Sequence, residues 1–349
     1  MNIRADIFSR LSRTDAHLFY LPPCPTPPFH SPPPQKRSPL HSRDKSKEKN
    51  VLITGTSLNG IGFESARVIA KHANLVIMTG HNSDRLNLAA DTIKRELPSA
   101  NIRPLILDLS SLDAVRKAAG EVNAFPEPLH VLIHNAAAPI GPFKLTVDNL
   151  ESQVATDHIC PFLFTKLVAP KILSARTEHY TPRVIFVSSI GHGIGTGVNF
   201  DTLGRPDPTR YVPMEAYYQA KSANVLTAIE LSKRSKGQIN AYSLHPGGIY
   251  TNIMNPASAP KEAVEGLHKL GLLEADGTPR KDATLKTMGQ GAATTLVAAF
   301  DPRLDDKSGA YLNDCVAANE LIGPPSSDPA NAERLWNLTE QIIGETFTF

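Results

Sequence analysis

Short apolar runs alternate with longer amphipathic stretches from residue 51 onward, and this alternation restricts the possible fold more than any other feature. The apolar runs, at 51–54, 74–79, 102–107, 131–134, 183–187 and 239–244, each have the length of a buried strand. Helical periodicity marks the stretches between them, at 61–72, 83–97, 112–122, 148–174 and 215–235. This regular β-α order predicts an α/β fold with a doubly wound, mostly parallel sheet and helices on both faces.

The composition fits a globular chain rather than a disordered or membrane-spanning one. Its 349 residues are 41% hydrophobic and 20% charged, which is enough for one large core, and no break in composition divides residues 50–349. No apolar run approaches the ~18 residues that a membrane span needs. We therefore expect a single domain over 50–349 and no membrane span.

The first 49 residues differ from the rest. Residues 21–49 are dense in Pro, Ser and basic side chains, a composition that cannot bury enough apolar surface to offset its ordering entropy. We expect 1–49 to be a disordered extension. Arg4, Arg10 and Arg13 weakly resemble a mitochondrial presequence, although Asp6 and Asp15 interrupt the pattern. The expected location is the cytoplasm, with mitochondrial targeting as the alternative.

Cysteine usage and charge exclude several kinds of site. Cys24, Cys160 and Cys315 are odd in number and form no C-x-x-C pair, which argues against a disulfide framework or a zinc site and favours a reducing compartment. Beyond residue 50 the chain has 27 Lys and Arg against 30 Asp and Glu. We expect no metal and no nucleic-acid partner, because nucleic-acid binding would need a clustered basic face.

A glycine-rich turn, TGTSLNGIG at residues 54–62, follows the first predicted strand and opens a predicted helix. Glycines at such a junction let the backbone approach a pyrophosphate, whose charge is met by free N–H groups and the helix dipole. Glycine turns also occur for steric reasons alone, but the place after the first strand of a β-α-β unit favours a dinucleotide site. The residues expected to contact the cofactor here are Gly55, Thr56, Ser57, Asn59, Gly60, Ile61 and Gly62.

The end of the second predicted strand bears on the choice of cofactor. The chain reads MTGHNSDR over residues 78–85, with no acid where one would bind a ribose 2′-hydroxyl. A missing acid favours a 2′-phosphate, so NADP(H) is favoured over NAD(H). His81 or Arg85 would supply the positive charge, although Arg85 also fits an ordinary solvated helix position.

Three side chains form a candidate catalytic set. Tyr217 and Lys221 are four residues apart in a predicted helix, which places them on one face, and the ammonium would tune the acidity of the phenol. Ser189 follows the fifth predicted strand, at the edge where doubly wound folds bind ligands, and could hydrogen-bond a substrate oxygen. The structural alternatives are a packed tyrosine beside an exposed lysine and a serine that only forms a turn.

Taken in order, these motifs resemble the short-chain dehydrogenase/reductase family. The segments that carry the resemblance are the glycine turn, Asp108-Leu109, HNAA at 134–137, Ser188-Ser189, Tyr217-x-x-x-Lys221 and HPGG at 245–248. The resemblance covers about residues 50–250 and points to the branch of retinol dehydrogenases and WW-domain oxidoreductases with their fungal relatives.

The resemblance implies a seven-stranded Rossmann sheet and an NADP(H)-dependent oxidoreductase that interconverts a carbonyl and an alcohol on a small, lipophilic molecule. Tyr217 would donate the proton, Ser189 would hold the carbonyl oxygen, and Lys221 would bind the nicotinamide ribose and tune Tyr217. A homodimer through the two long helices is usual in the family. The implied cofactor contacts beyond the glycine turn are Asp108, Leu109, Asn135, Ala136, Tyr217, Lys221, Pro246, Gly247, Ile249 and Thr251.

The chain departs from the family at two points. Four residues separate Gly55 from Gly60 where the family has three, so the loop must bulge. Asp157 stands where the family has an asparagine that supports a water relay to the lysine. An ionised Asp157 would stabilise the Lys221 ammonium and destabilise a nearby phenolate, which predicts an alkaline-shifted activity profile or a slower proton relay.

Two alternatives to a reductase stay open. A dinucleotide-binding sensor would keep the glycine turn and lose the chemistry, which Asp157 favours and the retained Ser189, Tyr217 and Lys221 oppose. An epimerase or isomerase would retain its cofactor and show no net cofactor turnover.

Two further segments are assigned structural roles. Residues 252–286 are expected to form a substrate lid with a short helix near 262–270. The apolar stripe after Asp328-Pro329 predicts a capped packing helix at the end of the chain.

Overall fold

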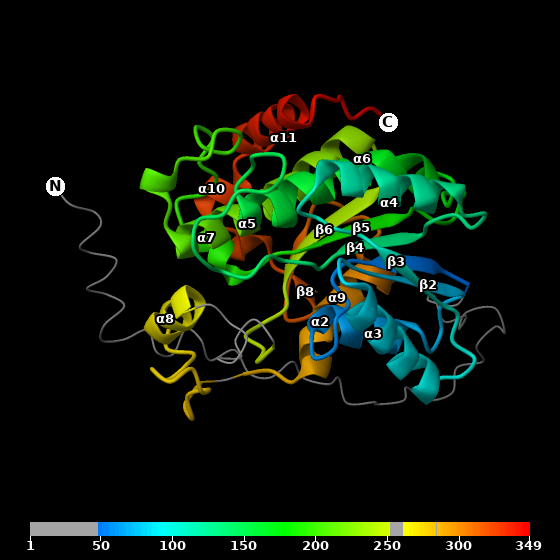
Figure 1. Cartoon of the computed structure of the whole chain (residues 1–349). Helices are drawn as coiled ribbons and strands as arrows, with labels where there is room; N and C mark the ends of the chain where they lie inside the picture. Colours follow the sequence, from blue (N-terminus) through cyan, green and yellow to red (C-terminus); the bar gives the residue numbers. More distant parts are fainter. Residues whose placement is uncertain (1–47, 252–260, 284) are drawn as a thin grey trace, which may run out of the picture.

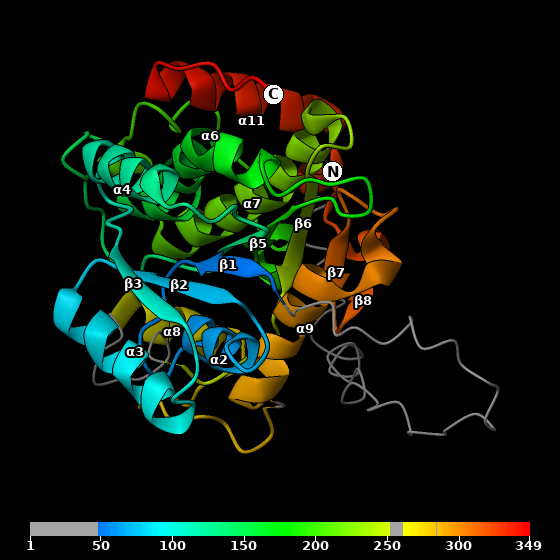
Figure 2. The same cartoon turned by 90° about the vertical axis from the view of Figure 1, so that its right-hand side faces the viewer.

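The computed structural model describes residues 48–251, 261–283 and 285–349. Its strands form one sheet in the order β3-β2-β1-β4-β5-β6-β7-β8, with helices on both faces (Figures 1 and 2), which confirms the predicted doubly wound α/β fold. The strands are β1 (Asn50–Ile53), β2 (Leu75–Gly80), β3 (Ile102–Ile106), β4 (Val131–His134), β5 (Arg183–Val187), β6 (Asn240–His245), β7 (Tyr311–Asn313) and β8 (Val316–Ala317).

The sheet has eight strands rather than the seven expected. Strands β1 to β7 pair in parallel, and β8 returns antiparallel beside β7. Asp314 and Cys315 connect β7 to β8 with φ values of 46° and 67°, a left-handed pair that allows a two-residue hairpin turn. The extra strand is therefore a short addition at the edge and leaves the parallel core of the prediction intact.

Each face of the sheet carries its own helical layer. Helices α2 (Ile61–Ile69), α3 (Ser83–Glu96) and α9 (Met288–Phe300) cover one face, and α4 (Leu112–Ala124), α6 (Cys160–Leu173) and α7 (Pro213–Ser235) cover the other (Figure 2). Side chains alternate along β1 accordingly, with Leu52 in the core under α4, α6 and α7, and Val51 and Ile53 in the core under α2, α3 and α9.

The strand order reverses between β1 and β4, because the chain builds outward to β3 on one side of β1 and to β7 on the other. At such a switch point the loops that leave the carboxyl ends of the two strands go to opposite faces, and the space between them can receive a ligand. The glycine turn after β1 and the loop after β4 meet at this point.

The predicted helix over 148–174 is wrong in its first part. Leu145 and Glu151 form an isolated antiparallel bridge, α5 (Ser152–Val154) begins after it, and residues Ala155–Ile159 form a wider π-helical turn before α6. Pro161 has no N–H to donate to the carbonyl of Asp157, so the α-helical ladder cannot pass this point unbroken. Asp157 thus lies within the π-helical turn.

The predicted packing helix at the end of the chain is confirmed as α11 (Pro329–Ile343). The Asp328 side chain caps its first turn by accepting from the Ala330 N–H, and Gly344 ends it in the left-handed conformation. Trp336 packs on Phe162 of α6 at 4.7 Å between ring centroids. Figure 1 shows α11 lying outside α7, with which it shares many contacts.

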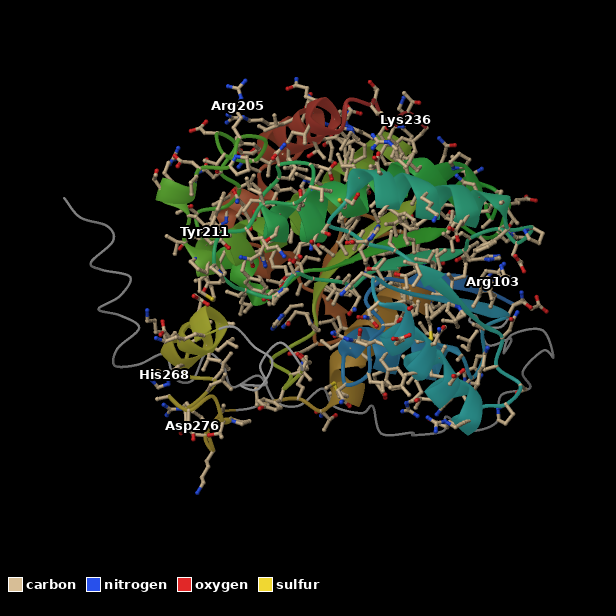
Figure 3. The ribbon with its side chains drawn as sticks, in the orientation of Figure 1. Arg103, Arg205, Tyr211, Lys236, His268 and Asp276 are labelled. Carbon is tan, nitrogen blue, oxygen red and sulfur yellow. The ribbon has the colours of Figure 1, made fainter. Side chains whose placement is uncertain are left out.

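Two predicted segments lie partly outside the described residues. The extension 1–49 lies outside them except for its last two residues, and the lid 252–286 is described from 261 onward except for residue 284. Helix α8 (Lys261–Lys269) stands where the short lid helix was predicted. Figure 3 shows Tyr211 and His268 on the side of the molecule that carries α8, away from Arg103 of β3. Among the described residues no helix combines the length and the apolar character needed to cross a bilayer.

Candidate active site

The glycine turn packs against the loop after β4 at distances that exclude side chains. Gly55 has a φ of 71°, and a Cβ there would lie 2.7 Å from the Ala136 Cα. A Cβ on Gly62 would lie 2.4 Å from both the Asn135 Nδ2 and the Gly55 carbonyl oxygen. Both positions therefore need glycine to bring α2 and the β4 loop together at the switch point.

The additional residue of the turn is accommodated at Asn59, whose φ of 58° is left-handed. Asparagine tolerates this conformation better than most residues, so the bulge has little strain. Thr56 is buried, and its hydroxyl donates to the Thr79 carbonyl of β2. Ser57 and Asn59 are exposed on the outside of the turn.

The first turn of α2 has no side-chain cap, unlike its neighbours. Asn82 caps α3 and Ser111 caps α4, whereas Gly60 stands at the N-cap of α2 without a side chain to accept from its amides. Free N–H groups and the positive end of the helix dipole favour an anion at this place. The residues present therefore fit the pyrophosphate of a dinucleotide.

Thr54 and Asn135 hold the turn and the β4 loop together. The Thr54 hydroxyl oxygen accepts from the N–H groups of Asn135 and Ala136, each at 3.0 Å. The Asn135 side-chain amide donates to the carbonyls of Thr54 and Gly55, also at 3.0 Å. The role of Thr54 was not predicted, although its position directly before Gly55 was visible in the sequence.

The other predicted cofactor residues also lie at the carboxyl ends of strands. His81 and Arg85 are exposed after β2, and the Asp108 carboxylate near the end of β3 accepts from Ser110. The turn after β6 begins the segment that contains Pro246, Gly247, Ile249 and Thr251. Lys286 lies against Gly247 and forms an ion pair with Asp314. Leu109 is buried and contributes to the core.

Tyr217 and Lys221 lie on one face of α7, as predicted. The Lys221 Nζ is 5.4 Å from the centroid of the Tyr217 ring, and Lys221 is only 3% exposed. The structural alternative of an exposed lysine is therefore wrong. Within the described part of the chain the Tyr217 hydroxyl makes no hydrogen bond, which leaves it available to a substrate.

The loop after β5 brings Ser189 to this pair. The Ser188 hydroxyl donates to the Lys221 carbonyl at 2.7 Å, and a Cβ on Gly191 would lie 3.2 Å from Cε1 of Tyr217. The Ser189 hydroxyl oxygen accepts from the Gly191 N–H at 3.1 Å. The two segments predicted to supply the catalytic set are thus in direct contact.

Asp157 meets Lys221 directly. Its Oδ2 accepts from the Lys221 Nζ at 2.8 Å, its Oδ1 accepts from the Ala138 N–H at 2.7 Å, and both side chains are buried. Burial alone would lower the pKa of Lys221, but the Asp157 carboxylate, with a further contribution from Tyr217, outweighs burial and the pKa is raised. Burial also raises the pKa of Asp157, an effect that Lys221 and Ala138 only partly offset.

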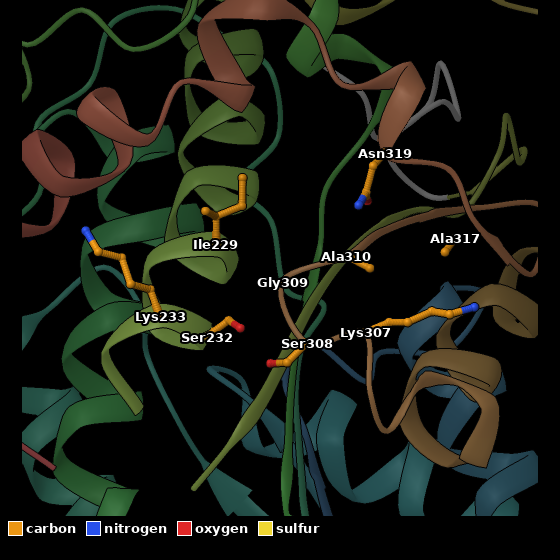
Figure 4. A pocket seen from close by; sticks show the side chains of 9 residues that line it. All are labelled: Ile229, Ser232, Lys233, Lys307, Ser308, Gly309, Ala310, Ala317 and Asn319. Atoms are coloured by element: carbon orange, nitrogen blue, oxygen red, sulfur yellow. The ribbon is translucent and has the colours of Figure 1, made fainter. Parts of the chain in front are cut away.

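The rest of the described chain offers no competing centre. Its His, Cys, Asp and Glu side chains form no cluster of three that could hold a metal. A surface hollow of about 390 Å³ lies between the last turns of α7 and the chain before β7 (Figure 4), lined by residues such as Ile229, Lys233 and Ser308. This hollow is at the amino ends of β6 and β7, whereas Tyr217 and Lys221 lie toward the carboxyl edge.

The fold and the site define a dehydrogenase of the Rossmann class, with a dinucleotide turn beside a tyrosine–lysine pair. A family model described as short chain dehydrogenase matches residues 49–199. Taken with the relatives below, this match establishes that the chain belongs to the short-chain dehydrogenase/reductase family, whose members bind a nicotinamide dinucleotide.

Similar proteins extend the match over most of the chain. Short-chain dehydrogenase TIC 32 A, chloroplastic, of Brassica napus is 34% identical over 87% of this chain and 91% of its own length. WW domain-containing oxidoreductase of Danio rerio is 35% identical over 88% of this chain and 71% of its own length, which confirms the predicted branch. A crystal structure of an uncharacterized Mycobacterium paratuberculosis protein, 28% identical, superposes with a TM-score of 0.64 over 87% of this chain and 96% of that one.

Proposed function

We propose that this protein is an NADP(H)-dependent oxidoreductase that interconverts a carbonyl and an alcohol on a small, lipophilic molecule. The observation that carries the proposal is the contact between the Ser189 loop and the Tyr217–Lys221 pair, beside a glycine turn that fits a dinucleotide. These are the groups that carbonyl reduction needs at one place.

Each residue has a defined task in the proposed reaction. A bound nicotinamide supplies the hydride. The Ser189 hydroxyl donates a hydrogen bond to the substrate oxygen, and the Tyr217 hydroxyl gives that oxygen its proton. Lys221 holds the cofactor ribose and provides positive charge beside the phenol. Asp157 fixes the lysine and reduces the effect of its charge.

The proposed preference for NADP(H) rests on the end of β2. His81 follows Gly80 where an acid would bind a ribose 2′-hydroxyl, and Arg85 is exposed in the first turn of α3. A 2′-phosphate would be attracted there rather than repelled. The remaining cofactor contacts follow the motifs: the glycine turn, Asp108 with Leu109, Asn135 with Ala136, and the segment from Pro246 to Thr251.

A lipophilic substrate is supported by apolar surface around the reacting groups. Ile190, the residue after Ser189, is 47% exposed, and Val212 at the start of α7 is 52% exposed. Ile190 is next to Ser189 in the chain, and Val212 directly precedes the helix that carries Tyr217. Apolar side chains placed beside a few polar groups are typical of small-molecule sites.

A catalytically impaired dinucleotide sensor is the second candidate. The direct Asp157–Lys221 pair favours it, because a paired ammonium does less to ease ionisation of Tyr217. We place it second because Ser189, Tyr217 and Lys221 are all retained and the segments that carry them are in contact.

We propose the cytoplasm as the working compartment, in line with an odd number of cysteines and no C-x-x-C pair in the sequence. A homodimer would have to use a surface other than the outer side of α7, because α11 packs there.

The test is oxidation of NADPH by the purified protein across a panel of aldehydes, ketones and quinones, with Tyr217→Phe measured in parallel. We expect turnover by the wild type, loss of at least about a thousandfold in Tyr217→Phe, and NADPH binding by both. NADPH binding without turnover of any compound would favour the sensor.

A further inference from the structure

The peptide unit that follows Ser189 is held at both ends by histidine rings. The Ser189 carbonyl oxygen lies 2.6 Å from Nδ1 of His192, and the N–H of Ile190, the other end of the same planar unit, donates to Nδ1 of His245 at 3.2 Å. His192 is on the turn after β5 and His245 is the last residue of β6. Neither belongs to the catalytic set.

The contacts of His192 define its tautomer. Its Nε2 accepts from the Gly323 N–H at 3.3 Å, and a backbone amide can only donate. Nε2 therefore lacks a proton, so Nδ1 carries one and donates to the Ser189 carbonyl. Burial lowers the pKa of His192, which favours the neutral ring, against the opposing effect of the Ser189 and Leu321 carbonyls.

His245 has the opposite tautomer. Because its Nδ1 accepts from the Ile190 N–H, the proton of the neutral ring is on Nε2. Burial, with a smaller effect of Lys286, lowers the pKa of His245 to about 4. One ring thus acts as a donor and the other as an acceptor toward a single peptide unit.

The His192 ring is itself fixed by a distant part of the chain. A Cβ on Gly323 would lie 2.7 Å from the Gly193 Cα, so the two backbones touch. The buried Ser326 hydroxyl donates to the His192 carbonyl at 3.0 Å and lies 2.8 Å from the Ser222 hydroxyl of α7. The segment between β8 and α11 therefore supports the loop that carries Ser189.

We infer that His192 and His245 are positioning residues that fix the Ser189 hydroxyl by clamping the Ser189–Ile190 peptide unit. The carbonyl carbon of this unit is bonded to the Ser189 Cα, so displacement of the unit would carry the hydroxyl away from a substrate oxygen placed by Tyr217. An error of about 1 Å in such a group can lower the rate a hundredfold. The expected loss of rate rests on the proposed function, whereas the contacts of the two rings with the peptide unit do not.

Two variants of His192 separate the clamp from simple packing. The side-chain amide of asparagine lies near the position of Nδ1 and still donates to the Ser189 carbonyl. The longer side chain of glutamine reaches toward the position of Nε2, where it accepts only from the Gly323 N–H. We expect His192→Asn to retain kcat within about threefold and His192→Gln to lose at least about tenfold, with similar KM for NADPH and similar Tm. Equal kcat in the two variants, or losses that follow Tm, would overturn the inference.

A double-mutant cycle checks that His192 acts through Ser189. In a Ser189→Ala background, His192→Gln should lower kcat no further, because the hydroxyl that it positions is gone. A full additional loss in that background would also overturn the inference.

The tautomers can be measured whether or not the protein is a reductase. Long-range ¹H–¹⁵N correlation spectra of protein labelled with ¹⁵N-histidine should show His192 protonated at Nδ1 and His245 at Nε2 at neutral pH. The reverse assignment at either ring would contradict the clamp. Absence of carbonyl turnover with the expected tautomers would instead refute the proposed function and leave the clamp in place.

Discussion

Lys221 is charged in a fully buried position because a single carboxylate, that of Asp157, lies 2.8 Å away. An isolated ammonium there would be strongly disfavoured, so the pair is held as a unit with no net charge. Tyr217 is 5.4 Å from the same ammonium, measured at its ring centroid, and experiences the lysine together with its counter-charge. Glu151, buried near Asp157, adds further negative potential. The residue that departs from the family thus controls the electrostatics of the site.

Asp157→Asn should move the pH–rate profile of alcohol oxidation toward acid. Removal of the carboxylate leaves the Tyr217 phenolate as the anion that can balance the buried Lys221 ammonium, which favours the phenolate that accepts the proton. We expect an acid shift of about one pH unit, measured as kcat/KM against pH with a secondary alcohol that the enzyme turns over. An unchanged profile would show that Asp157 has no electrostatic part in the reaction.

Glu151→Gln is the matched control for this variant. It makes the same acid-to-amide change, but Glu151 caps α5 and does not contact Lys221. Its profile should shift by much less than that of Asp157→Asn. A shift of equal size would mean that general loss of negative charge, and not the contact with Lys221, causes the effect.

The sequence indicates the proposed reacting side chains and Asp157 beside Lys221, but not the other contacts that hold them. Ser189, Tyr217 and Lys221 could be predicted because a short spacing and a strand end are local patterns. The contacts of His192 with Gly323, and of Asp157 with Ala138, join segments that only the folded chain brings together. No local pattern marks a histidine as a donor to a carbonyl three residues earlier.

At the scale of elements, the glycine turn depends on close backbone contact between α2, β1 and the β4 loop. Gly62→Ala would place a Cβ 2.4 Å from the Gly55 carbonyl oxygen, so the turn must move. We expect NADPH affinity to fall by at least about tenfold and stability to fall by about 1–3 kcal/mol. Titration calorimetry and denaturant unfolding measure the two effects.

Gly120→Ala is the control for that change. Gly120 lies in α4 with no atom within 4 Å of an added Cβ. Alanine there should leave NADPH affinity unchanged and raise stability by roughly 0.5–1 kcal/mol, because glycine is unfavourable inside a helix. Wild-type NADPH affinity in Gly62→Ala would contradict our account of the turn.

The elements themselves were predictable to different degrees. The six predicted strands are all present within about one residue at either end, since buried parallel strands appear as continuous apolar runs. The β7–β8 hairpin was missed because its strands have three and two residues, too few for a periodic pattern. The π-helical turn at Ala155–Ile159 was also missed, although Pro161 marked the interruption.

At the scale of the whole molecule, buried neutral histidines make stability depend on pH. Burial lowers the pKa of His134 and of His158 from 6.5 to about 3. Below pH 6.5 each of these rings binds a proton in the unfolded chain but not in the folded chain. Their contribution to the free energy of unfolding is therefore complete above pH 6.5 and is lost as the pH falls toward 3. Each ring should lower the free energy of unfolding by about 2 kcal/mol at pH 5.

Urea unfolding at pH 7.5 and at pH 5 tests this expectation. His134→Phe should reduce the loss between the two pH values, whereas a change at the exposed His179 to Gln should not. Equal pH dependence in wild type and His134→Phe would show that the buried ring is not the cause.

In the proposed reaction, hydride passes to a carbonyl carbon while Tyr217 supplies the proton. The most direct measurement is transfer of deuterium from NADPH labelled at the reactive C4 position, with the product analysed by mass spectrometry. We predict one deuterium on the carbinol carbon of each product molecule formed by the wild type, and no detectable product from Tyr217→Phe. Conversion of the substrate without deuterium in the product would contradict it and identify an isomerase or epimerase instead.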